Sequence, residues 1–160
     1  MASQALIKDF EDLIGKENVF TSEADRQSYS FDSAVLEPVV PAMVLRPTTT
    51  EQLGLCVKKL YDNGIPMTVR GAGTNLSGGT IPDRSDTVVI LTNGLNRILE
   101  INESDLYAVV ECGVVTADFA NAVAAKNLLY PPDPGSQSVS TIGGNIAENA
   151  GGLRGLKYGV

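Results

Sequence analysis

The sequence of 160 residues contains no histidine and no tryptophan, and it has only two cysteines, Cys56 and Cys112. Without histidine, the chain lacks the side chain that most often serves as a general base and as a metal ligand. The cysteines form no Cys-x-x-Cys pair, so neither a disulfide framework nor a zinc site is indicated. We expect both to be small buried apolar residues. If the protein is an enzyme, its reactive chemistry should come from a cofactor or from residues elsewhere.

Basic residues are also scarce, with 12 Lys and Arg against 19 Asp and Glu and a formal net charge of −7. This balance argues against nucleic acid as a partner, and any bound phosphate should be held locally by backbone N–H groups. No apolar run approaches the roughly 18 residues of a membrane helix, and no signal peptide is recognisable. We therefore predict no transmembrane segment and a cytoplasmic location, with membrane association of a full complex left open.

The composition, 43% hydrophobic with 16 Gly and 8 Pro, is typical of a loop-rich globular protein. The apolar spacing predicts helices over residues 3–15 and 21–30 and a strand centred on 42–45. A longer helix should start at Thr48 or Thr49, with a capping box formed by Thr49 and Gln52. This helix should bury Leu53, Cys56, Val57 and Leu60 and end at Gly64.

A strand over residues 65–70 completes a β-α-β unit, whose crossover should be right-handed with parallel strands. Three further strands are predicted over 86–92, 97–102 and 106–113, and the short turns between them imply antiparallel neighbours. A helix capped by Thr116 follows, and then an irregular remainder.

The predicted fold class is therefore α+β. A small parallel β-α-β subdomain should span residues 1–79, and an antiparallel α+β subdomain should span residues 80–160.

The stretch "VRGAGTNLSGGTIPD" at residues 69–83 places a glycine-rich loop directly after a strand. A Rossmann fingerprint fails, because Leu76 stands at the third glycine and no helix can follow. A P-loop fails as well, because Gly79 stands where the lysine is needed. What remains is a loop between two strands, in which glycines let the backbone approach an anion closely. Such a loop suits a diphosphate; the alternative is a tight structural turn.

A second loop, "DPGSQSVSTIGGNIAENAGG" at residues 133–152, combines hydroxyl side chains with glycine pairs. Its small residues leave room for a flat ring against the backbone. A flexible linker is the alternative, but it fits poorly with the interleaved apolar residues Ile142, Ile146 and Leu153.

Four segments together resemble the FAD-binding domain of the vanillyl-alcohol oxidase and p-cresol methylhydroxylase flavoproteins. More closely, they resemble the glycolate oxidase flavoprotein subunit and the FAD-linked D-lactate dehydrogenases. They are "RPTTTEQL" (46–53), "VRGAGTNLSGG" (69–79), "PPDPGSQSVSTIGGNIAENAGG" (131–152) and "LKYG" (156–159). The resemblance implies FAD as cofactor, clamped between a parallel and an antiparallel subdomain. The first loop would cradle the pyrophosphate through Arg70, Gly71, Ala72, Gly73, Thr74, Asn75, Leu76 and Ser77. The second would line the adenosine and isoalloxazine ends through Asp133, Pro134, Ser138, Thr141, Gly143, Gly144, Asn145, Ala147, Asn149, Ala150 and Gly151.

Two departures from the family pattern matter. Relatives with covalent flavin often carry a histidine in the first loop, where this chain has Thr74 and Asn75, so non-covalent FAD is expected. The substrate domain of the family, with its histidines and metal ligands, would lie beyond residue 160. The chain thus looks like the N-terminal portion of a longer protein that lacks the final strands of its flavin domain, and it offers no catalytic base and no metal site.

The implied function is the FAD-binding portion of a flavin-dependent oxidoreductase. It would oxidise a small 2-hydroxy acid, of the glycolate or D-lactate type, by hydride transfer to FAD. Electrons would leave to a separate acceptor, an iron–sulfur partner subunit being one candidate, and the fragment alone would be inactive. The alternatives are a family member acting on another alcohol or a sugar lactone, and a stand-alone nucleotide-binding module without catalysis.

Overall fold

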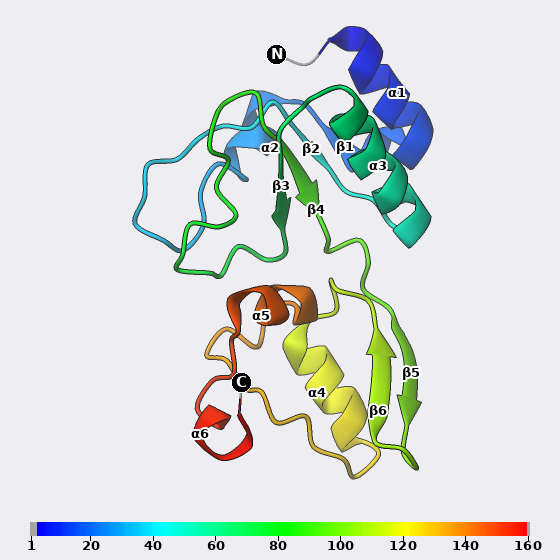
Figure 1. The fold of residues 1–160 in the computed structure, drawn as a ribbon, viewed down its shortest axis with the longest axis vertical. Coiled ribbons are helices and arrows are strands. Elements are labelled where there is room, and N and C mark those ends of the chain that lie inside the picture. Colours follow the sequence, from blue (N-terminus) through cyan, green and yellow to red (C-terminus); the bar gives the residue numbers. More distant parts are fainter. Residues whose placement is uncertain (1–2, 160) are drawn as a thin grey trace. The chain divides into compact units, whose positions relative to one another are not determined.

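A computed structural model describes residues 3–159 of the chain. The chain divides into two compact units, the first ending at Gly94 and the second beginning at Leu95 (Figure 1). Each unit contains one β-sheet and its own helices. None of the helices within residues 3–159 is long and apolar enough to cross a membrane.

The first unit is built on a four-stranded sheet with the order β1-β2-β4-β3. Strands β2 and β3 both run parallel to β4, which lies between them, while β1 pairs antiparallel with β2 at the edge. Because β2 and β4 are buried along their whole length, they consist of unbroken apolar runs, as inner parallel strands do. The strand bounds are β1 Val19–Phe20, β2 Met43–Leu45, β3 Met67–Arg70 and β4 Val88–Leu91.

Successive residues of the sheet point to opposite faces, and both faces are covered. On one face, Met43, Leu45, Val88 and Ile90 form a core with residues of the helices α1 (Gln4–Ile14) and α3 (Thr50–Asp62). On the other face, Val44, Val89 and Leu91 pack with Phe20 and Tyr29, close to the short helix α2 (Glu23–Gln27).

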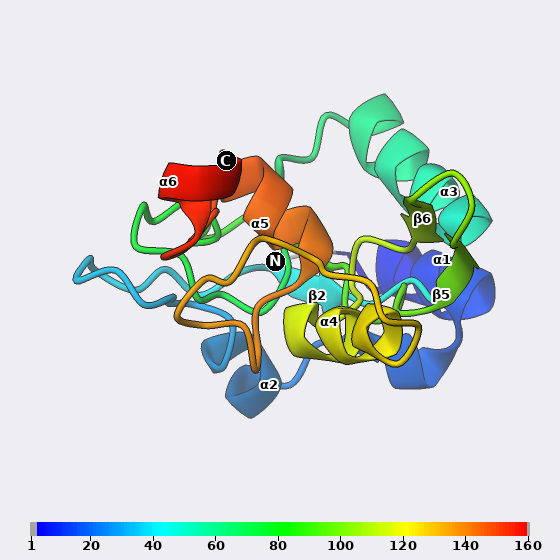
Figure 2. The same cartoon turned by 90° about the horizontal axis from the view of Figure 1, so that it is seen from below.

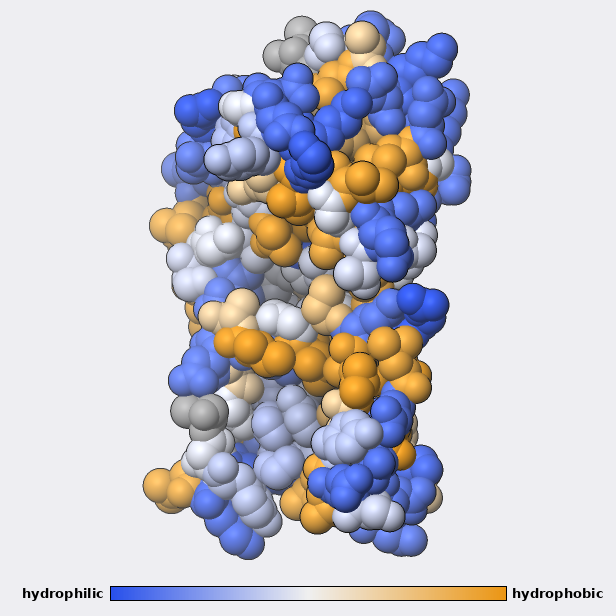
Figure 3. Space-filling view, turned by 45° about the vertical axis from the view of Figure 1, so that its right-hand side comes forward, coloured by the Kyte–Doolittle hydropathy of each residue, from blue (hydrophilic) through white to orange (hydrophobic). Residues whose placement is uncertain are grey.

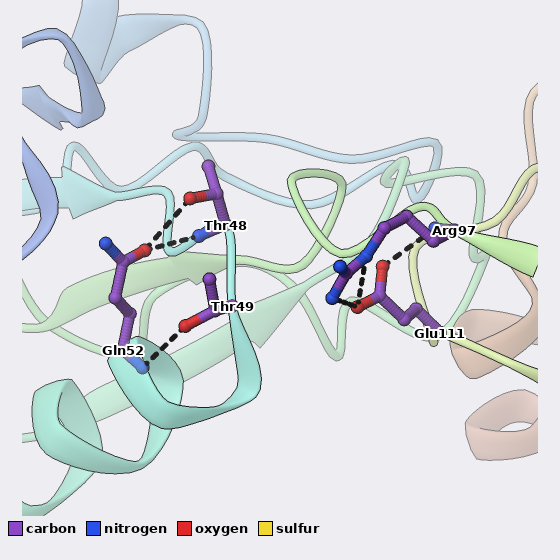
Figure 4. A network of polar contacts seen from close by, with 5 residues as sticks. All are labelled: Thr48, Thr49, Gln52, Arg97 and Glu111. Atoms are coloured by element: carbon purple, nitrogen blue, oxygen red, sulfur yellow. Dashed lines mark hydrogen bonds and ion pairs between the residues drawn. The ribbon is translucent and has the colours of Figure 1, made fainter. Parts of the chain in front are cut away.

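Helix boundaries in this unit follow the predicted capping signals. The backbone N–H of Gln52 donates to Thr49 Oγ1 at 3.2 Å, and Gln52 Oε1 accepts from the Thr48 backbone N–H at 2.9 Å (Figure 4). The predicted cap at Thr49 is thus confirmed, whereas the return bond of the capping box reaches Thr48 instead of Thr49. Ser22 caps α2, and α1 ends at Gly15, whose φ of +87° suits glycine. A short 3-10 helix, η1 (Lys16–Asn18), follows.

The second unit packs a helix against a two-stranded antiparallel sheet. Strands β5 (Ile98–Asn102) and β6 (Tyr107–Val110) form the hairpin, and α4 (Thr116–Ala124) supplies Phe119 and Val123 to the core. The Phe119 ring meets the Tyr130 ring edge-on, with centroids 4.8 Å apart. Two shorter helices complete the unit, α5 (Ile142–Glu148) and α6 (Gly155–Tyr158).

Residues 125–141 lead from the end of α4 back to its beginning (gold to orange in Figures 1 and 2). The return is fixed by backbone hydrogen bonds from Thr116 to Ser140 and from Ala117 to Gln137, both 2.9 Å. This course brings the start of α5 beside the start of α4. A stretch expected to be irregular therefore contains two helices and an ordered return.

The predicted antiparallel pairing of residues 86–92 with the next strand is wrong. Short turns favour pairing between strands that are neighbours in the sequence, whereas β4 pairs in parallel with β2 and β3. The parallel unit consequently extends to Gly94 rather than to residue 79.

Two side-chain expectations also fail. Val57, predicted to lie in the buried stripe of α3, is 37% exposed. Val115 rather than Thr116 occupies the N-cap position of α4. The hydroxyl of Thr116 is buried and bonds elsewhere in the second unit.

Candidate functional site

The first glycine-rich loop follows β3, and several of its backbone N–H groups lack hydrogen-bond acceptors within the described protein. Within the described part of the chain, no backbone N–H from Gly71 to Leu76 donates a hydrogen bond to another protein group. Gly73 has a φ of +71°, and a Cβ there would overlap the Arg70 guanidinium. Successive donors in a glycine-bent loop are the kind of backbone that binds anions.

Arg70 lies beneath this loop and is 7% exposed. Its Nη1 donates to the Phe31 carbonyl at 2.7 Å and to Thr80 Oγ1 at 3.3 Å, and its guanidinium lies 5.7 Å from the centre of the Tyr29 ring. Burial lowers the pKa of Arg70, and the charge of Asp32 acts in the opposite direction. Arg70 therefore supports the loop from within the first unit and places a positive charge under it.

Asp32 is a site residue that the sequence reasoning missed. Its carboxylate is 8% exposed and accepts hydrogen bonds from Asn75 Nδ2 at 2.7 Å and from Thr80 Oγ1 at 3.1 Å. Burial raises the pKa of Asp32, but the hydrogen bonds from Ala34, Asn75 and Thr80 outweigh it and hold that pKa below its ordinary value. No sequence motif marks this residue, because it lies about 40 positions before the loop in an irregular segment.

In the second unit, several predicted site residues form the start of α5. Thr141 caps the helix by accepting from the Gly144 N–H, and Asn145 Nδ2 donates to Thr116 Oγ1 at 2.7 Å. Thr116 Oγ1 also lies 2.9 Å from Ser140 Oγ. Thr116, Ser140, Thr141 and Asn145 are all buried, so this network orients α5 from inside the unit.

The predicted glycines of the second loop permit close backbone packing. A Cβ on Gly143 would lie 2.7 Å from Cys112 Cβ, and the Gly143 N–H donates to the Cys112 carbonyl at 2.8 Å. Gly151 is buried and accepts from the Asp133 N–H at 3.0 Å. The bend at this point also requires Gly152, which has a φ of +73° and no room for a Cβ beside the Asp133 carbonyl.

Asp133 Oδ1 accepts from the Arg154 backbone N–H at 2.9 Å, and Asp133 Oδ2 lies 3.3 Å from Arg154 Nε. This contact ties the beginning of the second loop to the segment before α6. Other predicted residues of this loop present surfaces to solvent, namely Ser138, Ala147 and Asn149.

An apolar cleft of about 760 Å³ opens into the core of the second unit. Its lining includes no charged side chain among the described residues, so it does not suit a diphosphate. Of the predicted cofactor residues, Gly143 borders it. Apolar side chains also reach the surface of this unit (lower half of Figure 3). The core residues that line the cleft include Ile101, Ala108, Val110, Phe119, Leu128 and Ile142.

Both glycine-rich loops lie within residues 41–160, which match the model of a protein family described as FAD binding domain. The chain belongs to this FAD-binding family. It is 47% identical over 146 residues to the glycolate oxidase subunit GlcD of Bacillus subtilis, covering 91% of this chain and 31% of that protein. It is 33% identical over 154 residues to the D-lactate dehydrogenase of Anaerostipes hadrus, covering 96% of this chain and 32% of the relative.

Among solved structures, p-cresol methylhydroxylase with substrate bound superposes with a TM-score of 0.78 at 23% identity, over 91% of this chain and 30% of that one. The chain therefore has the p-cresol methylhydroxylase type of FAD-binding fold, an α+β arrangement of a mainly parallel and an antiparallel sheet. It spans about a third of the length of the curated relatives it matches.

The FAD-binding domain has local features that fit a dinucleotide. The unpaired N–H groups from Gly71 to Leu76 match the donors that a diphosphate accepts from. They could hold it despite the net charge of −7, because these donors act locally. A buried positive charge on Arg70 supports the same loop.

Proposed function

We propose that this FAD-binding domain is part of a flavin-dependent oxidoreductase that oxidises a small 2-hydroxy acid of the glycolate or D-lactate type. Relatives named for glycolate and for D-lactate support this substrate class. When bound, FAD accepts the hydride equivalent, while the protein supplies binding, orientation and electrostatics. Electrons would then pass to a separate acceptor, an iron–sulfur partner subunit being one candidate, in the cytoplasm.

In this proposal, the backbone N–H groups from Gly71 to Leu76 bind the FAD diphosphate. The observation that supports the function best is that these N–H groups donate to no other protein group within residues 3–159. Thr74, Asn75 and Ser77 add side-chain contacts. In the second unit, the loop from Asp133 to Gly151 approaches the adenosine and isoalloxazine ends. The buried network under α5 keeps Gly143, Gly144 and the exposed face at Ala147 and Asn149 in one orientation.

We also propose that FAD is bound without a covalent link, since the first loop has Thr74 and Asn75 where relatives with covalent flavin often carry a histidine. Acid precipitation of the purified flavoprotein should release all of its yellow colour into the supernatant. Flavin retained in the washed pellet would contradict this part of the proposal.

The function is tested with the protein in its full natural length. It should purify with a flavin absorbance band and reduce an artificial electron acceptor when given glycolate or D-lactate. L-Lactate and p-cresol serve as comparison substrates. Failure to bind FAD at saturating concentration would refute the FAD site, whereas turnover of p-cresol alone would refute only the substrate class.

The first loop can be tested separately by comparing Gly73→Val with Ser77→Ala. A valine at Gly73 must adopt a φ of +71° and displace the Arg70 guanidinium, so FAD binding should be abolished. Loss of the Ser77 hydroxyl should weaken binding by only about 1 kcal/mol. Equal FAD dissociation constants for the two variants would remove the diphosphate role of the loop.

A further inference from the structure

Three consecutive residues of an irregular segment hold the first glycine-rich loop. The Phe31 carbonyl accepts from Arg70 Nη1 at 2.7 Å, and the Ser33 backbone N–H donates to the Gly73 carbonyl at 3.2 Å. Between them, Asp32 accepts from Asn75 at 2.7 Å. The loop is thus held at its beginning, at its positive-φ glycine and near its end.

The Asp32 carboxylate is itself rigidly placed. Oδ1 accepts from the Ala34 backbone N–H at 2.8 Å, which closes an Asx turn. Oδ2 accepts from Asn75 Nδ2, and the Thr80 hydroxyl lies 3.1 Å from both Oδ2 and Asn75 Oδ1. Asn75 and Thr80 flank the end of the glycine-rich stretch, so one carboxylate fixes both sides of it.

We propose that Asp32 is a positioning residue for the FAD diphosphate. By holding Asn75 and Thr80, it keeps the N–H donors of Gly71 to Leu76 in one conformation before FAD arrives. The conformational entropy of the glycine-rich loop is then lost when the protein folds rather than when FAD binds. This inference rests on the proposed function, in which the loop binds FAD.

The inference is testable because the charge of Asp32 and its hydrogen bonds have opposite effects on FAD binding. A negative charge beside a diphosphate disfavours binding, although the buried Arg70 lies near enough to offset it electrostatically. If charge dominated, Asp32→Asn would strengthen FAD binding. If the hydrogen bonds dominate, as we infer, the same variant weakens it, since an asparagine presents one acceptor oxygen in place of two.

The experiment compares Asp32→Asn with Glu37→Gln, which removes the same charge from an exposed side chain of the same segment. Both are made in the full-length protein, freed of flavin, and titrated with FAD and with riboflavin by flavin fluorescence. The wild type must bind FAD, and its failure to do so would refute the proposed function rather than this inference. Riboflavin lacks both the diphosphate and the adenosine, so it reports on the isoalloxazine part of the site.

We expect Asp32→Asn to raise the FAD dissociation constant by at least roughly tenfold, as loss of a hydrogen bond to a charged group does, with riboflavin affinity unchanged. Glu37→Gln should bind FAD like the wild type. Equal losses for FAD and riboflavin, or no loss of FAD affinity, would overturn the inference. Should Asp32→Asn fail to fold, Thr80→Val tests the same contacts: a selective loss of FAD affinity supports the inference, and unchanged affinity overturns it.

Discussion

Gly143 and Gly144 are adjacent glycines in the first turn of α5, yet they have different surroundings. A Cβ at Gly143 would lie 2.7 Å from Cys112 Cβ and 2.9 Å from the Cys112 carbonyl oxygen, part of the backbone. A Cβ at Gly144 would meet only the Thr141 hydroxyl, at 3.2 Å. We therefore predict that Gly143→Ala destabilises the protein more than Gly144→Ala does.

The magnitude follows from two opposing effects. Replacing glycine by alanine in a helix gains about 1 kcal/mol at either position. At Gly143, forcing an atom into a packed contact with backbone costs about 1–3 kcal/mol. The gain in helix propensity is nearly the same in both variants and therefore cancels when they are compared. Their free energies of unfolding should differ by about 1–3 kcal/mol, with Gly143→Ala the less stable.

Equilibrium urea unfolding followed by far-UV circular dichroism measures this difference, since the chain has no tryptophan to report by fluorescence. Thermal unfolding should separate the variants by roughly 2–4 °C per kcal/mol. If Gly143→Ala proved as stable as Gly144→Ala, α5 could not pack on Cys112 as the structure has it, and the orientation of the second loop would have to be revised.

Three further predictions concern stability and reactivity. Gly54 lies in the middle of α3, where an added Cβ would have no atom of another part of the protein within 4 Å. Gly54→Ala should therefore raise the free energy of unfolding by about 0.5–1 kcal/mol, and a decrease in thermal stability would contradict this. Hydrogen bonds from Arg97 hold the pKa of Glu111 below its ordinary 4.5 (Figure 4), so this carboxylate stabilises the fold above that pH and the contribution is lost as the pH falls through the lowered value. Glu111→Gln should therefore destabilise at about pH 7 and progressively less in acid, and a pH-independent difference would refute the reasoning. Burial raises the pKa of Cys56 to about 11, so in a Cys112→Ser background a thiol reagent should label Cys56 only after denaturation, and fast labelling of the native protein would count against its burial.

Much of the local structure follows from the sequence because its signals are local. The capping box at Thr49 and the glycine stop at Gly15 each depend on residues within one helical turn. The two glycine-rich loops are recognisable because glycines cluster between apolar segments. Their order along the chain is typical of the FAD-binding family. These features can be predicted without knowing which elements pack together in the folded protein.

Tertiary structure alone decided the partners of β4 and the support of the two loops. The run "VVIL" predicts a buried strand, but only packing shows that it inserts between β2 and β3. Asp32 reaches Asn75 across 43 positions, and Thr116, predicted as a cap, bonds to Asn145 across 29. Sequence by itself predicted most of the helices and strands before the second loop and indicated a diphosphate at the first loop, since propensity and backbone freedom are properties of short segments. It could not determine these long-range hydrogen bonds, because they exist only once distant segments have been brought together by the core.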